Sequence, residues 1–369
     1  MEKSILHRKA EHPSLIISLL LLAGILLGPY FVLSKLALTS LLLLSWGALV
    51  LMNVLIKNHL SKSLFSIICI LFWGFCIVQF QQNTDDHSLL DKLEKYIQPI
   101  RDIILHKIDL YIKNNSNSQF VKALLVGEKN NIDPETLEVY TALGIVHIIA
   151  ISGMHLDIIA QYLTKITGWL PKNKYLQLME LLFLTIAIIT YSLVAHASPS
   201  IIRAALFFCL YTMGAYFNLH RYMLNIIASG LLIIILFDYQ SITHIGWQLS
   251  YAAVLGIHFV HPIISNWLTL KNPIIQIIWN NFSITVSTQI STLPLLLYYF
   301  HTVSTGIILG NMVMIPLSNL LLEALIILLL LPAFWVKLFH WGEIIEIYMQ
   351  KTSQLVHYIF TISPQPLYF

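Results

Sequence analysis

The sequence predicts an all-α integral membrane protein, built as a polytopic bundle of about ten to eleven helical spans with broken helices. Of its 369 residues, 57% are hydrophobic and only 11% are charged, and long apolar runs recur along most of the chain. Soluble globular domains carry about 25% charged residues, so this composition excludes that class. Backbone polar groups in lipid must be paired within the protein, and apolar runs of this length meet that condition as helices.

Individual spans follow from the length that a helix needs to cross the hydrocarbon core, about 20 apolar residues. The runs of suitable length are residues 15–33, 36–56, 64–80, 146–166, 178–195, 201–217, 222–237, 245–264, 275–298 and 303–331, with a weaker one at 338–360. Proline interrupts helical hydrogen bonding, so we expect breaks at Pro294, Pro316 and Pro332. Gly153 is expected to mark a further break.

The basic residues predict the orientation. If the N-terminus is cytoplasmic, most Lys and Arg residues of the short loops fall on the inner side, among them Lys57, Lys172, Arg221 and Lys337. This asymmetry follows the positive-inside rule. A second apolar run follows the first almost at once, so we interpret the first as a retained span rather than a signal peptide. The expected location is the bacterial cytoplasmic (inner) membrane, with several passes.

One long polar stretch divides the chain into three parts. We expect residues 1–80 to form N-terminal membrane helices, residues 81–141 to form an amphipathic helical segment on the outer face, and residues 142–369 to form a second membrane domain. Within the polar stretch, apolar residues recur at helical spacing, as at Ile97, Ile100, Ile104 and Ile108.

Two local signals refine the polar stretch. Residues 114–118 are rich in Asn and Ser and are interpreted as a loop. Asp133 followed by Pro134 predicts a helix start, with Asp as the N-cap and Pro at the first helical position.

Polar groups at membrane depth are costly and mark bundle interiors, pathways or sites. Four clusters of them interrupt the apolar runs; their members include His147, Ser152 and His155, then Arg203, then His244, Gln248 and Ser250, and last Thr288, Gln289 and Thr292. One interpretation is structural: glycines allow close helix packing, hydroxyls bond across helices, and Arg203 extends to the interface. The other is a polar path through the bundle, with Arg203 facing water or an anion.

Enzyme motifs are weak in this sequence. H-E-x-x-H, G-x-x-x-x-G-K-[ST] and G-x-G-x-x-G patterns do not occur. The stretch Ala150-Ile151-Ser152-Gly153 resembles the G-x-S-G of intramembrane serine proteases, with Ala in place of the first Gly, and His155 is near enough in sequence to act as a base. We expect no enzyme activity, no catalytic residue, no metal site and no cofactor.

Several ordered motifs resemble the membrane-embedded domain of the ComEC competence-protein family. Residues 144–155 read GIVHIIAISGMH and match the family pattern almost completely. Further matching segments are ALLVGEK at 123–129, SIIRA at 200–204, DYQSITHIGWQLSYAAV at 238–254, QISTLP at 289–294 and NMVMIPL at 311–317. Tyr239 and Trp247 depart from the usual Pro and Phe.

The resemblance implies an inner-membrane channel core through which single-stranded DNA passes during natural transformation. Residues 142–369 would then be a competence-type channel domain. Its path would be lined by the motif residues His147, Ser152, His155, Arg203, His244, Gln248, Ser250, Thr288, Gln289, Thr292 and Asn311. We expect Arg203 to contact phosphate at the outer mouth, and the hydroxyl stripe between residues 283 and 292 to offer neutral hydrogen bonds to a moving polyanion.

The sequence also departs from the family. Full-length members carry an outer OB-fold insertion and a C-terminal metallo-β-lactamase-like domain, and neither is recognisable in this sequence. We therefore expect a membrane core whose partners are single-stranded DNA, the lipid bilayer and separate DNA-binding, nuclease and motor proteins. The sequence is compatible with an oligomer. Two alternatives stay open: a secondary transporter of an anionic solute, and, more distantly, an intramembrane serine hydrolase at Ser152.

Overall fold

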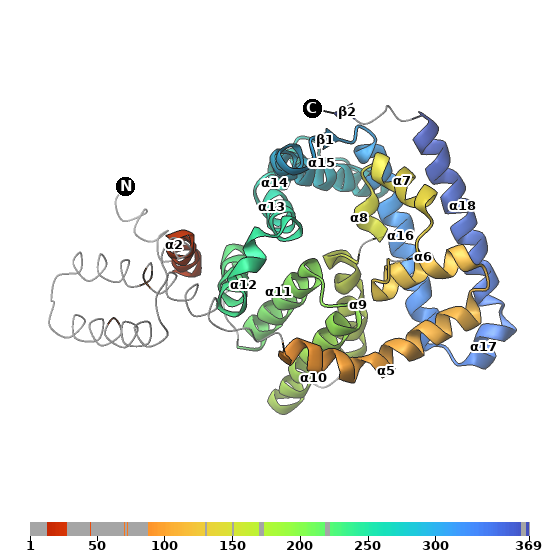
Figure 1. Ribbon diagram of the computed structural model, residues 1–369, viewed down its shortest axis with the longest axis horizontal. Coiled ribbons are helices and arrows are strands. Elements are labelled where there is room, and N and C mark those ends of the chain that lie inside the picture. Colours follow the sequence, from red (N-terminus) through yellow and green to blue (C-terminus); the bar gives the residue numbers. More distant parts are fainter. Residues whose placement is uncertain are drawn as a thin grey trace. The chain divides into compact units, whose positions relative to one another are not determined.

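A computed structural model describes residues 13–27, 88–129, 131–149, 151–169, 173–217, 222–362 and 367–368, together with residues 45, 70 and 72. These parts of the chain are almost entirely helical (Figure 1). The expected spans at 36–56 and 64–80 lie outside the described residues. Two compact units are present: residues 1–89 with 206–244, and residues 90–205 with 245–369.

In the first unit, α2 (Pro13–Leu27) packs against α12 (Met223–Phe237), which leads into η2 (Tyr239–Thr243). Ile25 and Ile235 are buried against each other. The hydroxyl of Ser18 is fully buried and donates to the carbonyl of Ala228 at 2.9 Å. A serine that bonds a neighbouring helix in this way is typical of helix packing in membranes.

In the second unit, two apolar cores are built around one long helix. Its helices are α5 (Ser88–Tyr111), α6 (Asn115–Val126), α7 (Pro134–Ala142), α8 (Val146–Ile149), α9 (Gly153–Thr167), α10 (Lys174–Val194), α11 (Pro199–Tyr216, which continues into the first unit), α13 (Ile245–Phe259), α14 (His261–Ser265), α15 (Pro273–Phe300), α16 (Ile307–Leu330), α17 (Ala333–Leu338) and α18 (Trp341–Ile362). The long helix α16 contributes Leu321, Leu322 and Leu325 to the first core and Met314 to the second. Strand β1 (Thr302–Val303) pairs antiparallel with β2 (Leu367–Tyr368).

The described part of the polar stretch, from residue 88 onward, consists mainly of helices, and its capping explains where α6 and α7 begin. Asp133 accepts from the backbone N–H of Thr136 at 3.1 Å, and Pro134 is the first residue of α7, so that predicted helix start is confirmed. The prediction of a loop at residues 114–118 is wrong, because α6 begins at Asn115. Asn114 instead acts as the N-cap of α6 by accepting from Asn117, which is the other role that asparagine serves before a helix.

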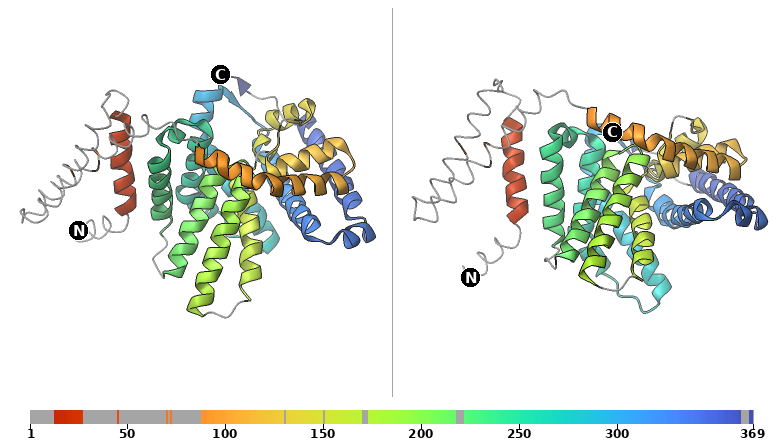
Figure 2. Two further views of the ribbon diagram at one scale, coloured as in Figure 1. Left: turned by 60° about the horizontal axis from the view of Figure 1, so that its bottom comes forward. Right: turned by 90° about the horizontal axis from the view of Figure 1, so that it is seen from below.

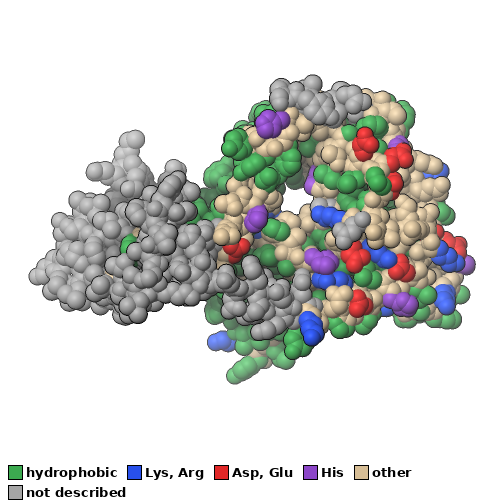
Figure 3. Space-filling model, viewed as in Figure 1, with side chains coloured by type: hydrophobic (Ala, Val, Ile, Leu, Met, Phe, Trp, Pro, Cys, Tyr) green, Lys and Arg blue, Asp and Glu red, His purple; other side chains and the backbone are tan. Residues whose placement is uncertain are grey.

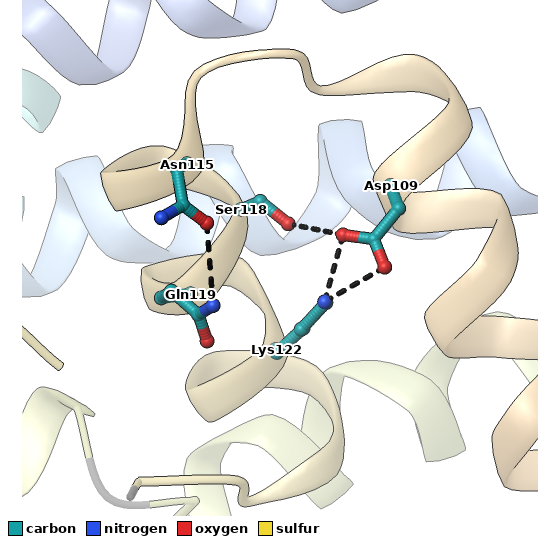
Figure 4. Close-up of polar contacts among 5 residues, drawn as sticks. All are labelled: Asp109, Asn115, Ser118, Gln119 and Lys122. Atoms are coloured by element: carbon teal, nitrogen blue, oxygen red, sulfur yellow. Dashed lines mark hydrogen bonds and ion pairs between the residues drawn. The ribbon is translucent and has the colours of Figure 1, made fainter. Parts of the chain in front are cut away.

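Asp109 fixes the connection between α5 and α6. Its carboxylate accepts from Ser118 at 2.7 Å and forms an ion pair with Lys122 at 2.7 Å, while Gln119 donates to Asn115 within α6 (Figure 4). Partial burial alone would raise the pKa of Asp109, but the hydrogen bonds from Lys122 and Ser118 together with the charge of Lys122 hold this pKa below its usual value. Charged side chains of both signs gather over α5, α6 and α7 (Figure 3).

Two helices among the described residues, α10 and α16, are long and apolar enough to cross a membrane; α12 is apolar but shorter. The predicted number of ten to eleven spans therefore stays a prediction. Two expected runs are divided, 146–166 into α8 and α9 and 245–264 into α13 and α14, whereas most of 338–360 lies in α18. The break in the first of these runs precedes Gly153, where one was expected.

Pro294 and Pro316 do not break their helices, so those two predictions are wrong. Both lie inside continuous helices, α15 and α16. An internal proline removes one backbone hydrogen bond, and a long helix can continue on both sides of it when its neighbours compensate. Pro332 does separate α16 from α17.

Helix α5 joins the C-terminal ends of both span-length helices. Arg101, 4% exposed, donates to the carbonyls of Val194 and Leu193 at the end of α10, and Lys107 donates to that of Leu329 at the end of α16. Six residues of helix cover about 9 Å, far less than the roughly 30 Å of the hydrocarbon core. In both views of Figure 2, α5 runs across the end of α10.

These contacts give a condition that the alternating topology expected from the sequence has to meet. Five expected spans separate residue 195 from residue 331, an odd number that would place them on opposite membrane faces. If α10 and α16 both cross the membrane, the contacts of α5 place their C-terminal ends on one side, and an even number of crossings separates them. We therefore predict that at least one of the five runs does not cross.

Cysteine accessibility tests this topology. In a variant lacking Cys69, Cys76 and Cys209, single cysteines at positions 115 and 340 are expected to react equally with an impermeant maleimide in intact spheroplasts. A cysteine at Trp169, which is 92% exposed before the start of α10, should react only after lysis. Opposite accessibility of positions 115 and 340 would contradict the shared face.

Candidate functional site

The break between α8 and α9 holds two of the predicted path residues together. Ser152 is the N-cap of α9, and its backbone N–H donates to Nδ1 of His155 at 3.1 Å. The Ser152 hydroxyl lies 2.9 Å from the same nitrogen. Because Nδ1 accepts the N–H, the neutral ring carries its hydrogen on Nε2. The pair thus stabilises a helix start, in the manner of a capping box.

Gly153 lets α9 begin directly against α11. A Cβ at this position would lie 3.2 Å from the Cβ of Ala204 and 3.8 Å from Nη2 of Arg203. Such a small residue allows two backbones to approach closely. The GIVHIIAISGMH and SIIRA segments, about 50 residues apart in sequence, therefore meet at this point.

Arg203 is buried without a charge partner. Its side chain is only 6% exposed, and its Nε and Nη1 have no hydrogen-bond partner. Among the described residues it forms no ion pair; its guanidinium lies 6.0 Å from the ring centre of Tyr251, which stacks on Trp247 at 3.9 Å. A cation–π contact offsets only part of the cost of burying a guanidinium. This arrangement leaves Arg203 able to bind an anion.

A cavity of about 250 Å³ lies beside the start of α11. Its walls come from four separate motif segments: Gly127 and Lys129 after α6, Ile151 before α9, residues 195–200, and Gly246 at the start of α13. Ser200 donates to the carbonyl of Ile151 at 3.2 Å and so joins two of these walls. Arg203 lies one helical turn beyond Ser200 on α11.

The backbone of this wall is unusual. His196 and Ala197 both have positive φ, 58° and 45°, a conformation that non-glycine residues rarely adopt. Such residues persist where the surrounding structure holds them, and they cluster at functional sites. Here they turn the chain from the end of α10 into the first turn of α11.

The hydroxyl stripe on α15 proves to be mainly a packing surface. Ser283, Thr285 and Ser287 are buried, and hydroxyls of the stripe donate to carbonyls of their own helix, as Ser287 does to Ser283 at 2.6 Å and Thr292 to Thr288 at 2.8 Å. Gly256 of α13 packs onto this surface. Hydroxyls that donate internally are not available as donors to a passing strand, which contradicts the role expected for them.

The remaining predicted path residues are dispersed. Gln248 accepts from the hydroxyl of Tyr299 at 3.0 Å and links α13 to the end of α15. His147 is exposed and contacts the carbonyl of Gly144 at 3.2 Å, and His244 is exposed in the first unit. Asn311 is 7% exposed with its Oδ1 unpaired. Ser250, Thr288 and Gln289 are half-buried.

None of the nine residues that line the cavity is among the predicted path residues, and those missed include Lys129, His196 and Gly246. Each lies inside or beside a quoted motif, so the motifs were a usable signal. Their proximity was not visible because it depends on the turn at residues 195–198.

The structure thus combines an almost entirely helical fold, in which two helices are long and apolar enough to cross a membrane, with a buried arginine that has no described charge partner. A family model described as "Competence protein" matches residues 124–366, well over half of the chain. The chain belongs to this family, the ComEC family of membrane competence proteins.

Two curated relatives support the assignment. ComE operon protein 3 of Bacillus subtilis (strain 168) is 27% identical over 249 residues, which cover 66% of this chain and 30% of that protein. A protein of Aquifex aeolicus (strain VF5) described as uncharacterized is 26% identical over 166 residues, 44% of this chain and 38% of its own length. The matches thus span well under half of each relative. No solved structure matches the chain.

Proposed function

We propose that this protein is the channel core through which single-stranded DNA crosses the cytoplasmic membrane during natural transformation. It would be a multi-pass protein with a cytoplasmic N-terminus. Separate proteins would bind DNA outside, degrade one strand and drive transport. It would act as a conduit, without enzyme activity of its own.

The observation that carries this proposal is Arg203. A buried cation without an acidic partner is costly, and it is retained where a function requires it. A single strand brings one negative charge per nucleotide, which a fixed positive charge in a low-dielectric path can offset. Arg203 also lies in a family motif, between the Gly153 break and the cavity.

Helix α5 fits the proposed outer face. Tyr96, Ile100, Ile103 and Leu110 are 42–79% exposed, although α5 is anchored to α10 and α16 on its other side. A helix with one packed face and one exposed apolar stripe suits the membrane interface. Its position would frame the outer end of the path.

A transporter of a smaller anionic solute would also use a buried arginine, and therefore remains the second candidate. The serine hydrolase is less well supported, because the Ser152–His155 contact is explained by helix capping. A fluorophosphonate probe that labels wild-type protein and not Ser152→Ala would favour the hydrolase.

Deletion of the gene in a naturally transformable host is the direct test. We expect transformation by free DNA to fall to the detection limit and to return when the intact gene is supplied in trans, because a polyanion has no other route through the hydrocarbon core. DNA bound outside the cell and uptake of small anions should stay normal. Normal transformation in the deletion strain would contradict the proposal, and a selective loss of anion uptake would favour the transporter.

A further inference from the structure

The cavity beside α11 has the properties of a site for a small anion. None of the residues that line it is acidic, and Lys129 and His196 bring basic groups to its wall. Two hydroxyls, those of Ser198 and Ser200, lie 3.4 Å apart at the same wall. Carboxylates are therefore absent from the described lining, and the available side chains are those that bind oxyanions.

The local backbone adds to this electrostatic preference. Helix α11 begins at Pro199, on the cavity wall, and the N-terminal end of a helix carries positive partial charge. One turn further along the same helix, Arg203 is 6% exposed, and its Nε and Nη1 have no hydrogen-bond partner. No described acidic residue neutralises its charge. This is an independent indication that an anion binds close to Arg203.

The cavity is large enough for a phosphate group. Its volume of about 250 Å³ is far above the roughly 10–15 Å³ that a single water molecule needs. A phosphate group therefore fits together with water.

We propose that this cavity binds one phosphate group at a time, held by Lys129, Ser198 and the start of α11. This inference rests on the proposed function for the source of the phosphate: in a DNA channel it is a phosphodiester of the strand, which would pause here next to Arg203. The cavity would then hold the strand by its backbone, independently of base sequence.

The test is phosphate and oligonucleotide binding to purified full-length protein in lipid nanodiscs. Inorganic phosphate and a short oligothymidylate are the probes, measured by calorimetry at several salt concentrations. Lys129→Gln is expected to weaken the affinities for inorganic phosphate and for the oligonucleotide by about five- to tenfold, because one charge-assisted contact is lost. For the oligonucleotide, the slope of log affinity against log salt concentration should become shallower by about 0.7. Lys129→Arg should retain most of the binding.

Lys95→Gln is the matched control, because Lys95 is an exposed lysine of α5 that does not line the cavity. It should bind both probes like the wild type. Ser198→Ala, which removes a lining hydroxyl whose contact is the 3.4 Å one with Ser200, changes no charge and should weaken phosphate binding at an unchanged melting temperature. Equal binding by wild type, Lys129→Gln and Ser198→Ala would overturn the phosphate site.

Failure of this inference can be told apart from failure of the proposed function. If Lys129→Gln leaves phosphate binding intact while gene deletion abolishes transformation, the channel stands and the phosphate site falls. If phosphate binding depends on Lys129 while gene deletion leaves transformation normal, the assignment of the phosphate to a DNA strand is overturned.

Discussion

Replacing Arg203 by glutamine is expected to reduce transformation by about 30-fold or more, because loss of a desolvated charged contact costs about 2–5 kcal/mol and 1.4 kcal/mol is a factor of ten. The abundance of the protein should not fall. Arg203 makes no hydrogen bond through Nε or Nη1, so its removal leaves no carbonyl unpaired and relieves the burial of a charge. The measurements are transformation frequency with free DNA and membrane abundance by immunoblot.

Two further variants separate charge from structure. Arg203→Lys should keep part of the transformation activity, because a phosphate contact depends more on positive charge than on the planar guanidinium geometry of arginine. Arg101→Gln is the structural contrast: Arg101 is equally buried but bonds the carbonyls of Leu193 and Val194, so its loss should lower abundance. Wild-type transformation by Arg203→Gln at normal abundance would end the phosphate-contact hypothesis.

The second large effect is expected at Gly256, where α13 meets α15. A Cβ there would overlap the Ser291 hydroxyl and lie 2.7 Å from the backbone oxygen of Ser287. The side chain can rotate, but the backbone oxygen moves only if the helices separate. Gly256→Ala is therefore expected to destabilise the protein by about 1–3 kcal/mol, the usual cost of overpacking, and to lower its melting temperature in detergent.

Gly246→Ala is the matched control for stability, because nothing lies within 4 Å of a Cβ at that position. Both glycines lie in α13, Gly246 at its second residue and Gly256 in its interior, so Ala gains helix propensity at both positions and more of it at Gly256. Gly246→Ala should melt at or slightly above the wild-type temperature. Equal melting temperatures for the two variants would show that α13 and α15 are not in close backbone contact.

Composition and local sequence patterns were sufficient to predict the fold class and the family of this protein. Apolar runs with few charges predict helices wherever they occur, because the backbone must pair within its own segment. Local capping was also readable, as Asp133 and Pro134 show, since an N-cap and its helix are only three residues apart. The motif segments around Gly153 and Arg203 were equally visible, because they are defined by adjacent residues.

Tertiary structure decided which of these segments meet and what their polar groups do. Pro294 and Pro316 remain inside helices, the hydroxyls of α15 bond their own backbone, and Arg101 and Lys107 bring the ends of α10 and α16 to one side. The cavity exists only because residues 195–198 turn α11 toward Gly127 and Ile151. These outcomes depend on contacts between residues far apart in sequence, whose free energies no local pattern contains. The sequence alone therefore determined the helices, and long-range packing decided the site.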